Sequence, residues 1–151
     1  MTFKTYNGSQ PDESAELMPD ILKALKEKGY QCYGESLFDI YVLNNNNSGK
    51  HVEIKVRLES QRESFPVSAK QWRLINGIKK ESPLNLNTKV LIYDAKKQQY
   101  SLTDLFEISQ HLQSTEPGST CYPQKSLFSK VTWINADIAF VDLCTWLCAA
   151  K

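Results

Sequence analysis

Residues 51–58, HVEIKVRL, alternate strictly between polar and apolar side chains. A period of two is the pattern of a β-strand, in which successive side chains point to opposite faces of the sheet. The predicted apolar face carries four aliphatic side chains, Val52, Ile54, Val56 and Leu58. The opposite face carries four polar ones, His51, Glu53, Lys55 and Arg57. We therefore expect a strand that packs on a core with one face and presents chemistry on the other.

The segment before this strand predicts its partner. Residues 37–43, LFDIYVL, form an apolar run with a single charge at Asp39, and residues 44–50, NNNNSGK, are rich in residues that favour turns. The simplest arrangement is an antiparallel hairpin, with Asp39 in the middle of its first strand. Such pairing can place Asp39 beside Glu53 on the second strand.

The rest of the chain predicts helices and strands in alternation. The expected helices cover residues 14–28, 69–80 and 136–150, and the expected strands cover 30–36 and 88–95. Residues 100–112 begin as a strand or turn and become a helix with Thr103 as its cap. Residues 59–67 and 113–130 are polar connections, and 131–134 form a short strand. We expect an α/β fold, with a central mixed sheet flanked by helices and a C-terminal helical appendage.

Three helix boundaries are predicted from single residues. Ser68 has the side chain of an N-cap for the helix that follows it, and Gly29 ends the first helix. Pro19 fits badly inside a helix, because it lacks the N–H that the preceding turn needs. Either the first helix begins near Pro19, or the turn before it is a separate one.

Composition sets limits on the class of protein. The chain has 151 residues, of which 41% are hydrophobic and 23% are charged, as expected for one globular domain over 1–151. Its net charge of +1 means that any surface attracting nucleic acid must be local. No apolar run is long enough to cross a bilayer, and the N-terminus does not resemble a signal peptide, so we expect a cytoplasmic protein. Its four cysteines should be reduced, buried thiols rather than metal ligands.

The charged residues of the hairpin predict a divalent-cation site. Two carboxylates, Asp39 and Glu53, repel each other at hairpin distance unless a cation lies between them, and oxygen ligands favour Mg²⁺ or Mn²⁺. The carbonyl of Ile54 could add a third oxygen. Lys55 could orient an attacking water or stabilise negative charge on phosphorus. The alternative is a solvated strand face, or an ion pair of Lys55 with Asp39 across the hairpin.

The run FDIYVL, a short loop and HVEIKVRL resemble the PD-(D/E)XK nuclease superfamily. Asp39, Glu53 and Lys55 match its metal-binding and catalytic residues, and Phe38 replaces the proline usually written before the aspartate. Many members add a serine or glutamine in the next helix, which Ser68 and Gln71 match. Over residues 14–95, the resemblance implies a restriction-endonuclease-like core (about 14–110). It also implies Mg²⁺-dependent hydrolysis of DNA phosphodiesters, with Mn²⁺ able to substitute.

The resemblance also implies an acidic residue in the first helix, which helps to hold a second metal or the catalytic water. Glu16 and Glu13 are the candidates, and we favour Glu16 because it is nearer to the apolar face of the helix. Either glutamate could instead simply favour the positive end of the helix dipole.

DNA contacts are expected from polar side chains near the predicted site and in the long loop. The first group is Arg57, Gln61, Arg62, Lys70 and Arg73, and the second is Gln124, Lys125 and Lys130. Together they could bind phosphates and base edges close to the cut. The alternative for each of them is an ordinary solvated surface residue.

The helix over 136–150 is apolar nearly all round, whereas a surface helix is apolar on one stripe. Two buried faces predict a subunit interface, so residues 113–151 are expected to form a loop and an oligomerisation helix of a dimer or tetramer. Overall likeness favours a homing endonuclease encoded by a bacterial group I intron, which makes a double-strand break in a long DNA target. The alternatives are a type II restriction endonuclease, a Holliday-junction resolvase, or an inactive DNA-binding or assembly module on the same fold.

Overall fold

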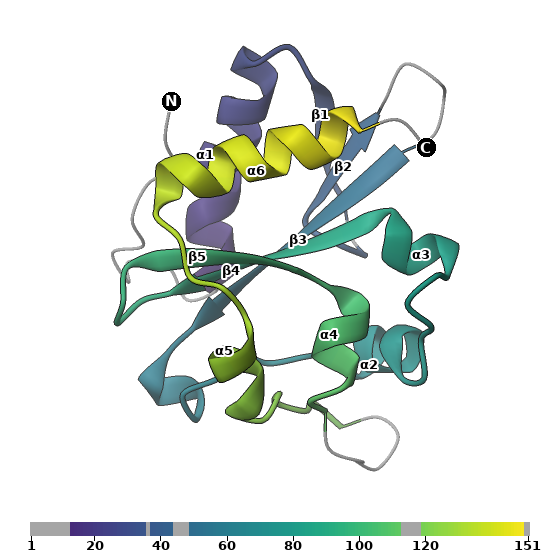
Figure 1. Ribbon diagram of the computed structural model, residues 1–151, viewed down its shortest axis with the longest axis vertical. Helices are drawn as coiled ribbons and strands as arrows, with labels where there is room; N and C mark the ends of the chain where they lie inside the picture. The colour runs from purple at the N-terminus through teal and green to yellow at the C-terminus, as the bar shows by residue number, and fades with distance from the viewer. Residues whose placement is uncertain (1–12, 36, 44–48, 113–118, 150–151) are drawn as a thin grey trace.

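A five-stranded mixed sheet forms the centre of the molecule (Figure 1). The computed structural model describes residues 13–35, 37–43, 49–112 and 119–149, apart from the side chains of 13–15. The strands are β1 (Gln31–Gly34), β2 (Ile40–Leu43), β3 (Gly49–Arg57), β4 (Thr88–Asp94) and β5 (Gln99–Asp104), and they lie in this order across the sheet. The β3–β4 pair is parallel and the other three pairs are antiparallel. The predicted mixed sheet is confirmed.

Helices cover both faces of the sheet. One face packs against α1 (Glu13–Glu27) and α6 (Ala136–Cys148). The other packs against α2 (Ala69–Ile75), α4 (Leu105–Ser109) and α5 (Ser126–Lys130), while α3 (Pro83–Leu86) precedes β4. The flanking helices that the sequence predicts are therefore present on both sides.

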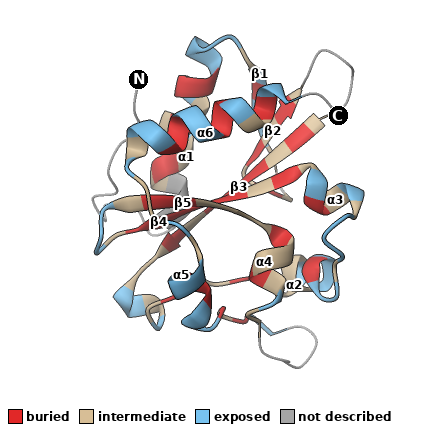
Figure 2. Ribbon diagram, in the orientation of Figure 1, coloured by how far each residue is buried: buried red, intermediate tan, exposed pale blue. Residues whose placement is uncertain are grey.

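A separate hydrophobic cluster lies between each face of the sheet and the helices that cover it, seen as buried segments on either side of the sheet in Figure 2. Alternation along β3 places Val52, Ile54 and Val56 in the cluster under α1 and α6, as predicted. The following strand supplies both clusters, because β4 is buried along nearly its whole length. From Val52 to Val56, β3 thus has one apolar side, and its other side is available for polar groups.

The β2–β3 hairpin has the register that brings Asp39 to Glu53. Ile40 pairs with Val52 in antiparallel register, so Asp39, the residue before Ile40, lies across from Glu53, the residue after Val52. The prediction that Asp39 lies in the middle of its strand is wrong, because β2 begins at Ile40. Asp39 instead ends a bend between β1 and β2, where its carbonyl accepts a hydrogen bond from the backbone N–H of Glu35 at 3.1 Å.

The helix that contains Pro19 is continuous. α1 runs from Glu13 to Glu27 with Pro19 inside it, so neither alternative predicted for its start is correct. Pro19 lies on the exposed side of α1, where water can solvate the carbonyl that its missing N–H leaves unpaired. Gly29 follows the helix with a φ of 104°, a left-handed conformation that favours glycine, and this confirms the predicted end.

Four shorter helices differ from prediction. α2 ends at Ile75 rather than at residue 80, because Gly77 adopts a φ of 75° that a helix does not continue. Ser82 then caps α3, which the sequence analysis missed. The cap of α4 is Asp104 rather than Thr103, since its carboxylate accepts from the N–H of Glu107 at 2.8 Å. α5 lies within the segment predicted as an open loop, of which residues 113–118 fall outside the described residues.

The C-terminal helix is part of the core. α6 buries one face, made of Ala139, Phe140, Leu143, Cys144 and Leu147. Its other face leaves Val141 61% and Ile138 46% exposed. Of the two buried faces that the sequence predicts for this helix, one is therefore buried against the sheet and the other is exposed in the single chain. None of the described helices is long and apolar enough to span a membrane.

Candidate active site

The two carboxylates predicted as ligands lie together at the start of the β2–β3 hairpin. The backbone N–H of Asp39 donates to Glu53 Oε1 at 3.3 Å. In return, the backbone N–H of Ile54 donates to Asp39 Oδ2 at 2.7 Å. Each carboxylate is thus fixed by the backbone of the other strand, so the hairpin determines the distance between them.

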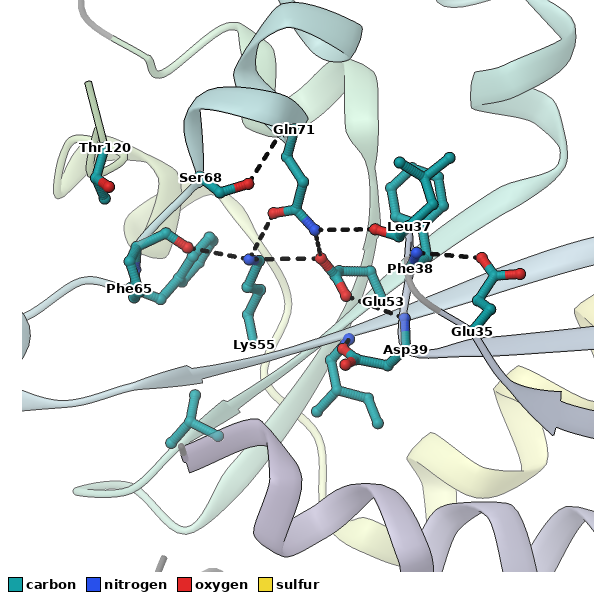
Figure 3. A pocket seen from close by; sticks show the side chains of 13 residues that line it. Glu35, Leu37, Phe38, Asp39, Glu53, Lys55, Phe65, Ser68, Gln71 and Thr120 are labelled. Atoms are coloured by element: carbon teal, nitrogen blue, oxygen red, sulfur yellow. Dashed lines mark hydrogen bonds and ion pairs between the residues drawn. The ribbon is translucent and has the colours of Figure 1, made fainter. Parts of the chain in front are cut away.

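Lys55 lies on the same face of β3 as Glu53, and its ammonium has three acceptors (Figure 3). Its Nζ lies 3.4 Å from Glu53 Oε2 and donates to the carbonyl of Pro66 at 3.0 Å and to Gln71 Oε1 at 2.9 Å. Three acceptors match the three N–H donors of a lysine ammonium, so the charge is fixed in position. The Pro66 carbonyl comes from the connection after β3, and sequence reasoning did not identify it.

The side chain of Gln71 links β3 and the bend before β2 to α2. Its amide donates to Glu53 Oε2 and to the carbonyl of Leu37, the second at 3.3 Å. The first turn of α2 holds Gln71, because its backbone N–H donates to the N-cap Ser68 at 3.2 Å, as the sequence predicts. Gln71 therefore fixes the orientation of both Glu53 and Lys55.

These groups line a pocket of about 310 Å³. Its walls are the bend before β2, the polar face of β3, the segment from Phe65 to Gln71, and Thr120 (Figure 3). The side chains of Glu53 and Lys55 are only 6% and 15% exposed. The pair is therefore not a solvated strand face, which was one alternative for this motif.

The electrostatics of the pocket favour an added positive charge. Burial, together with the hydrogen bond and negative charge of Glu53, raises the pKa of Asp39 to about 8, against smaller opposing effects from the Ile54 N–H and Lys55. At neutral pH, Asp39 therefore retains a proton that a cation could displace. Lys55 pairs with Glu53 rather than with Asp39, so the second alternative, an ion pair across the hairpin, is not what the structure shows.

The donor set fits a hard divalent cation. Asp39, Glu53 and the carbonyl of Ile54 would offer oxygen ligands, which Mg²⁺ and Mn²⁺ prefer. Within the described part of the chain, no three His, Cys, Asp or Glu side chains cluster as a metal site. A cation held here would therefore complete its ligand shell with water and substrate oxygens, as Mg²⁺ commonly does. The four cysteines are free thiols, of which three are buried as predicted, whereas Cys148 near the end of α6 is exposed.

The predicted first-helix acid is not among the residues that line this pocket. Glu16 lies half-buried on α1, and the side chain of Glu13 falls outside the described residues, so the role of either one stays a prediction. A different acidic residue, Glu35, does line the pocket. It lies in the bend between β1 and β2, where no sequence periodicity marks it.

Arg57 is held by groups of its own chain. Its Nη1 lies 3.0 Å from Asp94 Oδ2, and its Nε donates to the carbonyl of Glu63 at 2.8 Å. Its guanidinium also lies 4.1 Å from the ring centre of Phe128. Arg57 therefore fixes the connection after β3 to β4, which leaves it less suited to DNA contact than the sequence predicts.

The other residues predicted to contact DNA come from two segments that the fold joins. Residues 62–67 and 121–125 pair side by side through the Val67–Cys121 bridge and the Ser64–Pro123 hydrogen bond. Arg62, Gln124 and Lys125 are exposed on these segments, and Gln61 is half-buried beside them. Lys70 and Arg73 are exposed on α2, and Lys130 on α5. Hence predicted contacts that are about 60 residues apart in sequence lie on two paired segments, here called the rim, one of which contributes Phe65 and Pro66 to the pocket.

Comparisons with known proteins give a structural likeness but no sequence relative. No protein-family model and no curated protein sequence matches the chain. Among solved structures, a nuclease from a fusselovirus is similar, with 12% sequence identity and a TM-score of 0.44 over 83% of this chain and 84% of that one. A likeness of this degree says nothing about the activity of this chain.

Proposed function

We propose that this chain is a Mg²⁺-dependent DNA endonuclease whose active site contains Asp39, Glu53, Lys55 and Gln71. The observation that carries the proposal is the pairing of two carboxylates beside a fixed ammonium in one pocket. Neither a solvated strand face nor a cross-hairpin ion pair explains the motif, because Glu53 and Lys55 are largely buried and Lys55 does not pair with Asp39.

The residues of the pocket have separate roles in this proposal. Asp39, Glu53 and the Ile54 carbonyl would hold the cation, which activates water and polarises the phosphodiester when bound. Lys55 places a fixed positive charge where negative charge develops on phosphorus. Gln71 keeps Glu53 and Lys55 in these orientations through its two hydrogen bonds to them.

Nucleic acid suits the surroundings of the pocket. The net charge of the chain is only +1, yet Arg62, Lys70, Arg73 and Lys125 are exposed on the rim and on α2. Cations gathered near a phosphodiesterase site can bind the backbone of a substrate, and Gln124 adds a donor and acceptor for base edges. This local distribution supports DNA as the substrate.

The finer proposal is double-strand cleavage of a long target, as in intron homing. One such site cuts one strand, so two copies must act together, and α6 exposes Ile138 and Val141 as a contact surface for a dimer or tetramer. Sedimentation of the purified protein at micromolar concentration tests this. A monomer under those conditions would contradict it.

Plasmid cleavage tests the activity. We expect supercoiled DNA to be nicked and linearised in Mg²⁺ or Mn²⁺, and to stay intact when EDTA removes the cation. Preference for linear duplexes over four-way junctions would separate an endonuclease of this kind from a resolvase. Binding of DNA with no cleavage under any cation would instead support an inactive binding module.

A further inference from the structure

The bend that carries Asp39 is held by Glu35. The backbone N–H of Glu35 donates to the carbonyl of Asp39 at 3.1 Å, which closes the bend. Its carboxylate Oε1 accepts from the backbone N–H of Phe38, also at 3.1 Å (Figure 3). Glu35 therefore makes hydrogen bonds to both Phe38 and Asp39, the two residues that lead into β2.

Glu35 is in turn fixed to β3 by His51. His51 Nδ1 lies 2.8 Å from Glu35 Oε1, the oxygen that also accepts from Phe38. The imidazole lies between two aromatic rings, with centroids 5.4 Å away for Phe38 and 5.3 Å away for Tyr41. His51 is two residues before Glu53 on the same face of β3. One strand therefore carries Glu53 itself and, through His51 and Glu35, holds the bend that carries Asp39.

The contacts of Glu35 and His51 stabilise the bend at a point where the site itself is under electrostatic repulsion. Two carboxylates at this distance repel each other when both are ionised. Asp39 lies before the first residue of β2, so no strand pairing of its own holds it against that repulsion. Its position depends on the Glu35 bend and on its hydrogen bonds with Glu53 and Ile54.

We infer that Glu35 and His51 are positioning residues that hold Asp39 in place for cation binding, without themselves touching cation or DNA. The inference rests on the proposed site, since it assigns the cation to Asp39 and Glu53. It applies to affinity for the cation, which can be measured without any DNA. Its failure can therefore be distinguished from failure of the proposed nuclease activity.

The experiment is calorimetric titration of the full chain with Mn²⁺ alone, in the wild type and in two variants of His51. His51→Phe retains an aromatic ring between Phe38 and Tyr41 but removes the N–H. His51→Asn places an amide N–H where Nδ1 is. Losing one hydrogen bond of this kind should weaken Mn²⁺ binding about three- to tenfold in His51→Phe, and His51→Asn should stay close to the wild type.

The matched control is His111→Phe. His111, the other histidine of the chain, also pairs with a glutamate, since its Nε2 lies 3.2 Å from Glu107 Oε2, but neither residue lines the pocket. We expect His111→Phe to leave Mn²⁺ affinity unchanged. Equal weakening in His51→Phe and His111→Phe would overturn the inference, as would wild-type affinity in His51→Phe or weak binding in His51→Asn.

A second variant covers the case in which His51→Phe does not fold. Glu35→Ala changes a residue of the bend, outside both hydrophobic clusters, and should weaken Mn²⁺ binding by a similar factor. Where both variants fold, the double variant should be no weaker than either single one, because the two residues act through one contact. Additive losses, or wild-type affinity in Glu35→Ala, would overturn the inference.

Discussion

β3 carries two lysines on opposite faces, and they differ in what surrounds the ammonium. Lys50 is 3% exposed on the side under α6, where its Nζ donates to the carbonyls of Trp146 and Ala149 at 2.6 and 3.3 Å. Lys55 lies on the other side, against a carboxylate that has a second carboxylate beside it. Both are buried cations, so burial alone does not identify a functional lysine.

The partners explain the difference. Carbonyls at the C-terminal end of α6 carry the negative end of the helix dipole, and Lys50 places its positive charge and its hydrogen bonds on two of them. When both are ionised, Glu53 and Asp39 carry more negative charge than Lys55 balances, so this face of β3 favours the binding of a cation. We conclude that one face of the strand is built for stability and the other for chemistry.

The largest expected effect separates the two lysines by activity. Lys55→Met should lower the rate of DNA cleavage by about a thousandfold, because it removes charge that stabilises the transition state. Lys50→Met should leave the rate of the folded protein within about twofold. Single-turnover cleavage of a labelled duplex measures both, and equal losses in the two variants would remove the distinction.

A second prediction concerns the apolar face itself. Ile54 is 1% exposed, so Ile54→Ala should lower the free energy of unfolding by about 2–5 kcal/mol through lost burial and a residual cavity. Its backbone carbonyl, the proposed ligand, is unchanged. Denaturant unfolding gives the difference, and a loss below about 1 kcal/mol would show that this face does not supply the stability assigned to it.

Lys50→Met should have a smaller effect on stability. The substitution keeps an apolar stem near Trp146 but removes the charged donor from the carbonyls of Trp146 and Ala149, at a cost of about 1–2 kcal/mol. Amide hydrogen exchange should rise in the last turn of α6 and stay unchanged in α2. Protection in α6 that equals the wild type would contradict this role for Lys50.

The smallest effect is a pH dependence on the chemical face. The pKa of Asp39 is raised from 3.8 to about 8 in the folded chain, so the proton stabilises the fold fully below 3.8 and this stabilisation is lost as the pH rises through about 8. Asp39→Asn removes that dependence. Without metal, its melting temperature should gain a few degrees on the wild type between pH 6 and pH 9. A constant difference over this range would show that Asp39 is already ionised at pH 6.

The sequence predicts the residues on the polar face of β3 better than the contacts that hold them in place. Alternation over 51–58 and the turn-rich loop before it predict the hairpin that joins Asp39 to Glu53, and the Ser68 cap predicts how α2 presents Gln71. These are local patterns with a fixed period or spacing. The roles of Glu35 and Lys50 depend on contacts with His51 and α6, which only the tertiary fold brings together.

The same reason explains the errors in the predicted elements. Asp39 belongs to a bend rather than to a strand because Glu35 closes the turn before it, and this contact has no signature in the apolar run. The apolar character of α6 predicted two buried faces, whereas burial against the sheet accounts for one of them. Composition alone does not say which surface an apolar helix covers.

The central claim is that the polar face of β3 holds a divalent cation between Asp39 and Glu53. Crystals soaked in Mn²⁺ and measured at an anomalous wavelength test it directly. The account predicts a peak within bonding distance of both carboxylates and of the Ile54 carbonyl, and no such peak in Asp39→Asn crystals. A Mn²⁺ peak elsewhere, with none at this pair under conditions that support cleavage, would contradict it.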